Sequence, residues 1–231
     1  MIIRKPEVWV PAGQLHPDLI RKVERYARVC YKSEERMGEE FNPRFLRGIL
    51  QRGHESVIEH EKITVLFVVD RGVSHEIVRH RIASYSQEST RYVNYSQGRF
   101  GQEIAVIEPF YFQEDTAPYR IWQQACGQME QAYMALLEAG CSPQEARAVL
   151  PNSLKTELVA TYNLREWRHF FRLRCAVAAH PQMRQVAIPL LLHFQEQVPV
   201  VFEDIPYDQE FPSQFYARLK VTDDLLLAGV E

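Results

Sequence analysis

The segment from Arg79 to Tyr92 holds the densest group of side chains that could bind an anion or take part in chemistry. Residues 71–99 contain five arginines and two histidines against two acids, although the whole chain carries a formal net charge of -3. Serines, a threonine and amides interleave with the cations as short neutral donors. Arginine offers a planar, permanently charged fork, so this mixture suits an anionic, ring-bearing ligand such as a nucleotide.

A plainer interpretation of the same segment is a solvated basic helix face followed by a polar loop. The continuation to Ser89 and Arg91 after a polar turn favours a site. A second polar stretch, residues 53–60, carries two histidines and two glutamates, and metal binding is conceivable there. Its spacing matches no recognised ligand set, so a capped polar turn is favoured and no metal site is predicted.

Composition limits the class of protein. A length of 231 residues with 46% hydrophobic residues fits a globular protein with one well-buried core. The pI near 6.3 argues against a general nucleic-acid binder, which needs a broad basic face. The four cysteines contain no CxxC pair, and no apolar run resembles a signal region or a membrane span. We therefore expect a cytoplasmic protein with no membrane and no nucleic-acid partner.

Alternating helices and strands must position the polar segments. Apolar spacing predicts helices over residues 16–31, 43–53, 116–139, 143–150, 163–174 and 181–198, and strands within 2–10, 62–69, 104–112 and 156–162. A further helix capped by Ser74 is predicted to carry Ile77, Val78 and Ile82, with Glu76 and His80 one turn apart and able to pair. No repeat or linker is evident, so the pattern predicts one α+β domain over residues 1–231.

Four segments in order resemble one family. Arg79 to Arg91 reads Arg-His-Arg-x-x-Ser-x-x-x-x-Ser-x-Arg, which resembles the signature of the flavin-dependent thymidylate synthases. Residues 53–60 are similar to the family's upstream Gly-His-Glu loop, and residues 146–151 to its Ala-Arg-x-x-Leu-Pro segment. Residues 163–174 resemble its late flavin- and nucleotide-binding helix. These matches span roughly residues 50 to 190.

The resemblance implies an enzyme that converts dUMP to dTMP. Methylenetetrahydrofolate would be the carbon donor and NADPH the reductant, acting through bound FAD. The implied fold is a central antiparallel sheet flanked by helices, and the implied assembly is a homotetramer whose sites are shared between subunits.

The resemblance also implies roles for single residues. The flavin would be held by His54, Ser56, Arg79, His80, Arg81, Gln87, Asn163, Leu164, Arg165 and His169. The nucleotide dUMP would be held by Glu76, Arg79, Gln87, Glu88, Ser89, Thr90, Arg91, Arg147 and Arg174, with Arg147 supplied by a neighbouring subunit. Arg174 would contact the uracil ring and favour ionisation of its imide.

The residue types are consistent with this chemistry. Methylating uracil at C5 needs electron density on that carbon, and either a nucleophile adding at C6 or a fixed cation can provide it. No cysteine falls inside a motif, and Cys175 is interpreted as a small packed residue. Arg174 stays charged at working pH and can stabilise negative charge on the ring. Ser89 has no evident partner base, so it is assigned a binding role.

Departures from the family pattern and rival functions remain open. Glu76 stands where many relatives carry Gln, which places its contact with dUMP in question. Gln87 stands where some members have Glu, which changes the charge presented to the ligand. Residues 178–184 depart from the family's usual run and can alter folate-side packing. The rivals are a flavin- and nucleotide-binding protein of altered specificity, and an RNA-binding module built on Arg91 to Arg99.

Overall fold

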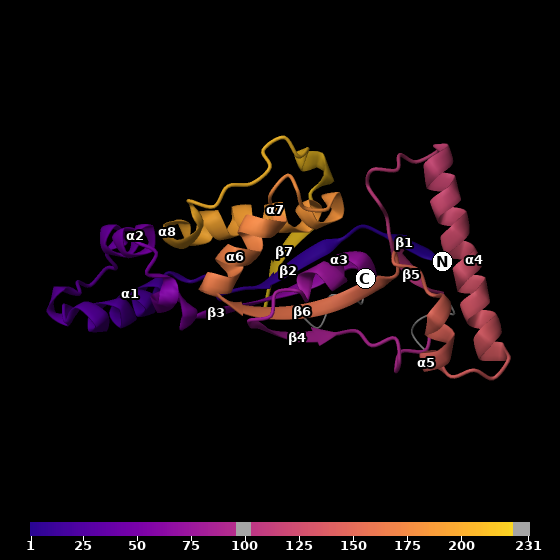
Figure 1. Ribbon diagram of the computed structural model, residues 1–231, viewed down its shortest axis with the longest axis horizontal. Coiled ribbons are helices and arrows are strands. Elements are labelled where there is room, and N and C mark those ends of the chain that lie inside the picture. The colour runs from indigo at the N-terminus through magenta and orange to yellow at the C-terminus, as the bar shows by residue number, and fades with distance from the viewer. Residues whose placement is uncertain (96–102, 224–231) are drawn as a thin grey trace. The chain divides into compact units, whose positions relative to one another are not determined.

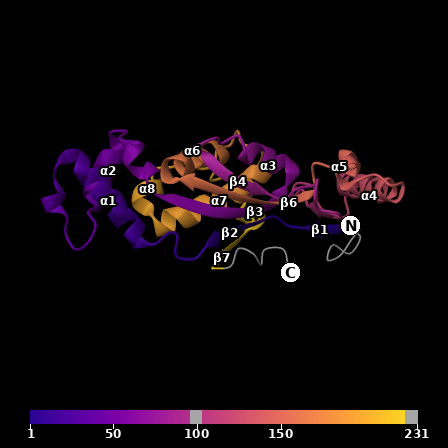
Figure 2. The same ribbon diagram turned by 90° about the horizontal axis from the view of Figure 1, so that it is seen from below.

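Helices and strands both contribute to the computed structural model, which describes residues 1–95 and 103–223 (Figures 1 and 2). The helices are α1 (Pro17–Tyr31), α2 (Pro43–Gln51), α3 (Arg71–Ile77), α4 (Ala117–Glu138), α5 (Pro143–Ala146), α6 (Leu164–Arg174), α7 (Pro181–Gln197) and α8 (Pro199–Phe202). The strands are β1 (Ile2–Arg4), β2 (Glu7–Pro11), β3 (Lys62–Asp70), β4 (Ala83–Gln87), β5 (Ala105–Ile107), β6 (Lys155–Asn163) and β7 (Arg218–Thr222). The predicted α+β class is confirmed.

The strands form two sheets. One has five strands in the order β4-β6-β3-β2-β7, and the other pairs β1 with β5. The β1–β5 pair is parallel, with Ile2 opposite Ala105 and Arg4 opposite Ile107, and is separate from the five-stranded sheet. The antiparallel course of the larger sheet and the homotetramer stay predictions.

The chain divides into two compact units. Unit 1 comprises Met1–Glu7, Phe67–Arg79 and Ser86–Val159, and unit 2 comprises Val8–Leu66, His80–Tyr85 and Ala160–Glu231. The single-domain assignment of residues 1–231 stays a prediction. Arg99, and with it the end of the Arg91–Arg99 segment, lies outside the described residues. Among the helices that the structure describes, none combines the length and the apolarity needed to cross a bilayer.

Unit 1 is organised around the long helix α4. Its Cys126 and Tyr133 are buried with Val106 of β5 and Ala146 of α5 in one apolar cluster. Helices α4 and α5 lie side by side in Figure 1. The capping box predicted at Ser142 and Glu145 is present, and it fixes where α5 begins.

Unit 2 has an aromatic core between α6 and α7. Trp167 and Phe171 of α6 pack against Phe194 of α7, with ring centroids 5.3 Å and 5.2 Å from that of Phe194. These two α6 residues lie four positions apart, on the helix face opposite to Arg165 and His169. Packing of this apolar face therefore turns the polar face of α6 outward.

The sequence-based boundaries of one helix were wrong. Asp70, not Ser74, caps α3, because the Asp70 carboxylate at the end of β3 accepts the N–H of Val73 at 2.7 Å. The helix begins at Arg71 and ends at Ile77, and both His80 and Ile82 lie beyond it. The predicted pairing of His80 with Glu76 is therefore replaced by a contact between His80 and Glu166 of α6.

Other departures are smaller. Residues 2–10 hold two strands, because Pro6 falls between β1 and β2. The tail after Pro199, which had no predicted structure, forms α8 and β7.

Candidate active site

A hollow of about 470 Å³ in unit 2 is the first candidate for a ligand site. It is lined by Glu55, Glu59, Ile82, Asn163, Arg165, Glu166, His169 and Arg172. Three of these, Asn163, Arg165 and His169, are among the flavin residues that the sequence predicted. The rest of the lining was not assigned to the flavin from sequence.

Helix α6 presents most of this lining. Asn163 caps the helix, and its Oδ1 accepts the N–H of Glu166 at 2.8 Å. Arg165, His169 and Arg172 follow at spacings of four and three residues, which places them on one exposed face. The cap thus fixes the start of the helix and with it the direction of its polar side chains.

Glu55 ties the arginines of α6 together. Its Oε1 accepts from Nε of Arg168 at 3.1 Å and from Arg172 at 3.3 Å, and its Oε2 lies 3.7 Å from Arg165. Arg168 is buried and also donates two hydrogen bonds of 2.6 Å to Asp204. Burial lowers the pKa of Arg168, whereas Asp204 and Glu55 raise it, with a net increase above its usual value. Arg168 is therefore a structural ion-pair partner that holds Glu55 under the hollow.

The residue chemistry around this hollow fits a flavin nucleotide. The side chains of Arg165 and Arg172 are 53% and 41% exposed, so their guanidinium groups stay accessible to an anionic diphosphate. Ile82 is 68% exposed and offers an apolar surface of the kind that a flat ring requires. Arg165 also pairs with Glu59, so a phosphate would share or displace that contact.

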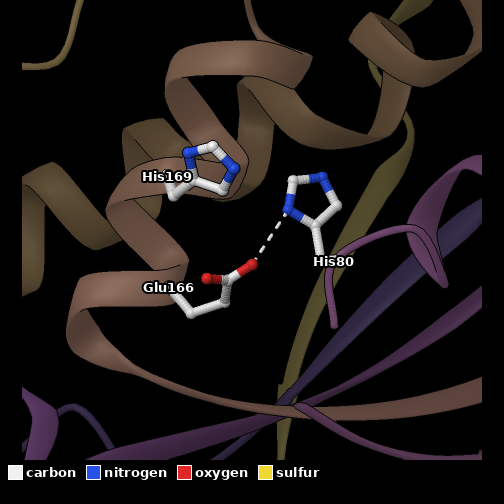
Figure 3. Close-up of side chains that lie close together, drawn as sticks. All are labelled: His80, Glu166 and His169. Atoms are coloured by element: carbon white, nitrogen blue, oxygen red, sulfur yellow. Dashed lines mark hydrogen bonds and ion pairs between the residues drawn. The ribbon is translucent and has the colours of Figure 1, made fainter. Parts of the chain in front are cut away.

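A buried chain of polar contacts adjoins the hollow in the same unit. Nδ1 of His80 lies 3.2 Å from Oε1 of Glu166, and Nε2 of His80 accepts from Nε of Arg174 at 3.1 Å. Figure 3 shows Glu166 and His169 on one helix and His80 on a separate segment. Both helix residues face the ring of His80. Burial lowers the pKa of His80 to about 4, with further lowering by Arg174 and His169.

The hydroxyl of Tyr85 fixes the backbone of this histidine. It donates to the carbonyl oxygen of His80 at 2.6 Å and lies 2.9 Å from the hydroxyl of Tyr162. Burial raises the pKa of Tyr85, and it likewise raises that of Tyr162 far above its usual value. Both phenols are therefore neutral hydrogen-bonding groups.

Three of these side chains have the composition of a metal site. One ligand atom each from His80, Glu166 and His169 lies within 4.8 Å of the others. Both ring nitrogens of His80 are engaged, however, and one of them faces the permanent charge of Arg174. A fixed guanidinium at this distance opposes a second cation, so the arrangement favours a hydrogen-bonded chain over a metal centre.

Unit 1 holds most of the residues predicted for dUMP. Gln87 donates to Ser74 at 2.9 Å, and Arg147 donates to Thr90 at 3.4 Å. This Arg147–Thr90 contact lies within one chain, whereas the resemblance implied that Arg147 serves a neighbouring subunit's site. Glu88 accepts from Tyr95 at 3.0 Å and from Lys155 at 3.2 Å, so its carboxylate is already satisfied by a phenol and an ammonium.

The remaining predicted nucleotide residues of unit 1 lie at or near the surface. Arg79 and Arg91 are exposed, and Ser89 and Glu76 are half-buried. The Ser89 hydroxyl accepts the N–H of Arg91 at 3.3 Å. The backbone N–H of Arg79 donates to the carbonyl oxygen of Glu76, but its side chain has no hydrogen-bond or ion-pair partner within residues 1–95 and 103–223, so its guanidinium is accessible to an anion.

Several predicted flavin residues of unit 2 do not line the hollow. Leu164 is fully buried, so any contact it makes with a ligand has to use its backbone. His80 is 3% exposed, and its nitrogens are engaged by protein groups. Nδ1 of His54 is hydrogen-bonded to the hydroxyl of Tyr31 at 2.8 Å. Ser56 and Arg81 are exposed and are not among the residues that line the hollow.

The sequence did not predict that Glu55, Glu59, Ile82, Glu166 and Arg172 would line this hollow. One local signal existed, since Arg172 continues the spacing of Arg165 and His169 along α6. The others depend on contacts distant in sequence.

The cysteines are consistent with their predicted lack of a chemical role. All four are free thiols. Cys175, next to Arg174 in sequence, is fully buried, and burial raises its pKa well above the usual value. A thiol in this state is a poor nucleophile, because the reactive form is the thiolate.

Comparison with known proteins defines the class. A family model described as thymidylate synthase complementing protein matches residues 14–200. The chain is 35% identical over 195 residues to a flavin-dependent thymidylate synthase of Geobacter sulfurreducens, covering 81% of this chain and 82% of that protein. It is 36% identical over 200 residues to one of Corynebacterium aurimucosum, covering 79% and 78%. The chain therefore belongs to the flavin-dependent thymidylate synthase family.

A solved structure supports the fold. The crystal structure of a UMP/dUMP methylase, PolB from Streptomyces cacaoi bound with 5-Br dUMP, has a TM-score of 0.69 to this chain. The two are 23% identical, and the match covers 88% of this chain and 96% of the other. This is a likeness of fold.

Proposed function

We propose that this protein is a flavin-dependent thymidylate synthase that methylates dUMP at C5 to give dTMP. Methylenetetrahydrofolate supplies the carbon, and NADPH supplies the reducing equivalents. The sum balances: dUMP, methylenetetrahydrofolate, NADPH and one proton give dTMP, tetrahydrofolate and NADP⁺. Family membership over residues 14–200 carries this proposal, and the polar hollow on α6, in which Arg165 and Arg172 are partly exposed, supports it.

FAD, when bound, supplies the hydride chemistry that the protein's side chains lack. Arg165 and Arg172 would hold the anionic part of this cofactor, and Asn163 and His169 would offer it hydrogen-bonding groups. Ile82 would give its ring an apolar surface. Asn163, Arg165 and His169 were expected from the resemblance, whereas Ile82 and Arg172 are proposed because they line the hollow.

The uracil ring is activated by a fixed positive charge. Arg174 keeps its charge at any working pH, and a guanidinium at the imide edge stabilises electron density that develops on the ring. This interaction strengthens as the ring gains charge, so it acts on the rate more than on binding. Neither the buried Cys175 nor any other thiol is required.

The nucleotide's phosphate needs cations of its own. Arg79, Arg91 and Arg147 are exposed arginines of unit 1 and serve this purpose in the proposal. Gln87, Ser89 and Thr90 add neutral donors. We further propose that the protein is a cytoplasmic homotetramer, as the family resemblance implies.

Purified protein tests this function. A bound flavin spectrum is expected, together with dTMP formation that requires dUMP, methylenetetrahydrofolate and NADPH. Arg47→Ala is the matched control, since it removes an exposed arginine that pairs with Glu203 away from the hollow's lining. A protein that binds no flavin, or that consumes NADPH without forming dTMP from dUMP, contradicts the proposal.

A further inference from the structure

The hollow on α6 has no excess of basic side chains with which to attract an anion. Its lining carries three carboxyl groups, from Glu55, Glu59 and Glu166, against two guanidinium groups, from Arg165 and Arg172. Because like charges repel, an anionic ligand entering this lining meets carboxylates beside the cations that it needs. An anion can therefore bind well only if a carboxylate gives up its contact with a guanidinium.

Two of the three carboxyl groups are fixed by the protein. Glu55 is engaged by three arginines, and its side chain is 16% exposed. The side chain of Glu166 is 9% exposed, and its Oε1 lies 3.2 Å from Nδ1 of His80. Neither group can leave without exposing or unpairing buried partners, so neither is the one that yields.

Glu59 differs from both. Its side chain is 42% exposed, and Arg165 is its only side-chain partner among the residues that the structure describes. The backbone of Glu59 closes a short 3₁₀ helix, Glu55–Glu59, whose Val57 and Ile58 are buried. The backbone is therefore anchored, whereas the carboxylate needs only a side-chain rotation to reach water.

The place where Glu59 meets Arg165 also suits a phosphate. Arg165 lies in the first turn of α6, where the helix dipole favours a negative group. Its Nη1 donates to Oε1 of Glu59. A guanidinium can give two parallel hydrogen bonds to a phosphate, and a diphosphate carries more charge than one carboxylate. A diphosphate can therefore replace Glu59 at Arg165, whereas a neutral ligand cannot.

We propose that Glu59 is an internal competitor for Arg165, which pairs with the guanidinium until the diphosphate of a ligand displaces it. Where that ligand is FAD, the assignment rests on the proposed function. The competition lowers the affinity of the hollow for every anion and selects against weakly charged ones. Glu59 thus sets how much negative charge a ligand must bring.

Binding of inorganic pyrophosphate tests the competition without turnover. Protein freed of flavin is titrated with pyrophosphate by calorimetry, and Glu59→Gln should bind it about two- to fivefold more tightly than the parent, the range that an exposed ion pair allows. The matched control is Glu203→Gln, since Glu203 is also 42% exposed and pairs with Arg47 away from the hollow's lining. An unchanged affinity in Glu59→Gln, or an equal gain in Glu203→Gln, overturns the proposal.

A double-mutant cycle separates competition for Arg165 from plain repulsion of the anion. Arg165→Ala should weaken pyrophosphate binding, and in that background Glu59→Gln should bring no further gain, since no guanidinium is left to release. Repulsion alone predicts a gain at least as large without Arg165, because the charge of Glu59 is then unpaired. That result, or pyrophosphate binding that does not depend on Arg165, overturns the proposal.

Flavins of different charge test the selection. In fluorescence titrations, Glu59→Gln should tighten binding of FAD, which carries a diphosphate, and leave that of riboflavin, which carries no phosphate, unchanged. An equal gain for both flavins shows that Glu59 acts on the ring and contradicts the proposal. If the parent binds no flavin or forms no dTMP, the proposed function fails, whereas the pyrophosphate titrations still decide whether Glu59 competes for Arg165.

Discussion

His80 and Arg174 are joined by a hydrogen bond of 3.1 Å in which the arginine donates and the histidine accepts. The two residues lie 94 positions apart in the chain. Because an arginine cannot accept, this contact requires a neutral histidine. Burial, and after it the nearby charge of Arg174, lowers the pKa of His80 to about 4, which keeps the ring neutral.

Stability should depend on pH through His80. In the unfolded chain an ordinary histidine takes up its proton near pH 6.5, whereas His80 in the folded protein does so near pH 4. Unfolding is then coupled to proton uptake, so stability present above pH 6.5 is lost as the pH falls toward 4. The groups that face His80 are Glu166, His169, Arg174, Tyr85 and Tyr162.

Urea unfolding of the parent and of His80→Gln between pH 4 and 7 measures this effect. The free energy of unfolding should fall less steeply with decreasing pH in the Gln variant, because no proton is taken up at this position. If the free energy of unfolding depends on pH equally in the two proteins, His80 is not held neutral in the folded parent.

Arg165→Ala should weaken flavin retention. The guanidinium lines the hollow and offers hydrogen bonds to an anion, each charged bond contributing about 1.5–3 kcal/mol. We expect the dissociation constant for FAD, measured by fluorescence titration, to rise at least tenfold. Arg81→Ala is the informative comparison, because Arg81 was predicted from sequence but does not line the hollow. If the Arg165→Ala protein binds FAD as tightly as the parent, the flavin does not bind at this hollow.

Arg168→Met should lower stability by roughly 3 kcal/mol, since it removes a buried cation bonded to Glu55 and Asp204. Glu55 also loses one of the groups that hold it under the hollow, so FAD binding should weaken in parallel. Chemical denaturation of this variant and of the exposed control Arg47→Met gives the comparison. Similar unfolding midpoints in both variants contradict the structural role of Arg168.

Cysteine chemistry should be dispensable. Single Cys→Ala changes at positions 30, 126, 141 and 175 are expected to leave dTMP formation intact, because no thiol is assigned to the site. Cys175→Ala should cost about 1–2 kcal/mol of stability through lost packing. The assay is kcat for each folded variant. Abolished turnover in one that still binds FAD and dUMP reveals a required thiol.

Local signals explain which parts of the fold were predictable. Helix α6 was predicted over residues 163–174 and is observed over Leu164–Arg174, because its cap and apolar spacing both lie within the segment. Helix α3 was misplaced, because its cap comes from Asp70, the last residue of a strand. Ser74 was an equally plausible cap in the sequence, but it does not cap the helix in the structure.

The site shows the same limit. Arg165 and His169 share one face of α6 and Asn163 caps the same helix, so their assembly at the hollow could be predicted from a recognised motif. The partner of His80 could not, because Glu166 lies 86 residues away and the local candidate was Glu76. Glu55 and Glu59 likewise join the hollow only through tertiary contacts with α6.

The most direct test of the account is single-turnover oxidation of protein whose bound FAD has been reduced beforehand, mixed with saturating dUMP and methylenetetrahydrofolate. The account predicts one dTMP for each flavin oxidised in the parent. In Arg174→Ala the rate should be lower by about 100-fold or more even though dUMP is saturating, and Arg174→Lys should recover only part of it, because an ammonium lacks the planar fork. Flavin oxidation without dTMP, or a parental rate in Arg174→Ala, would contradict the account.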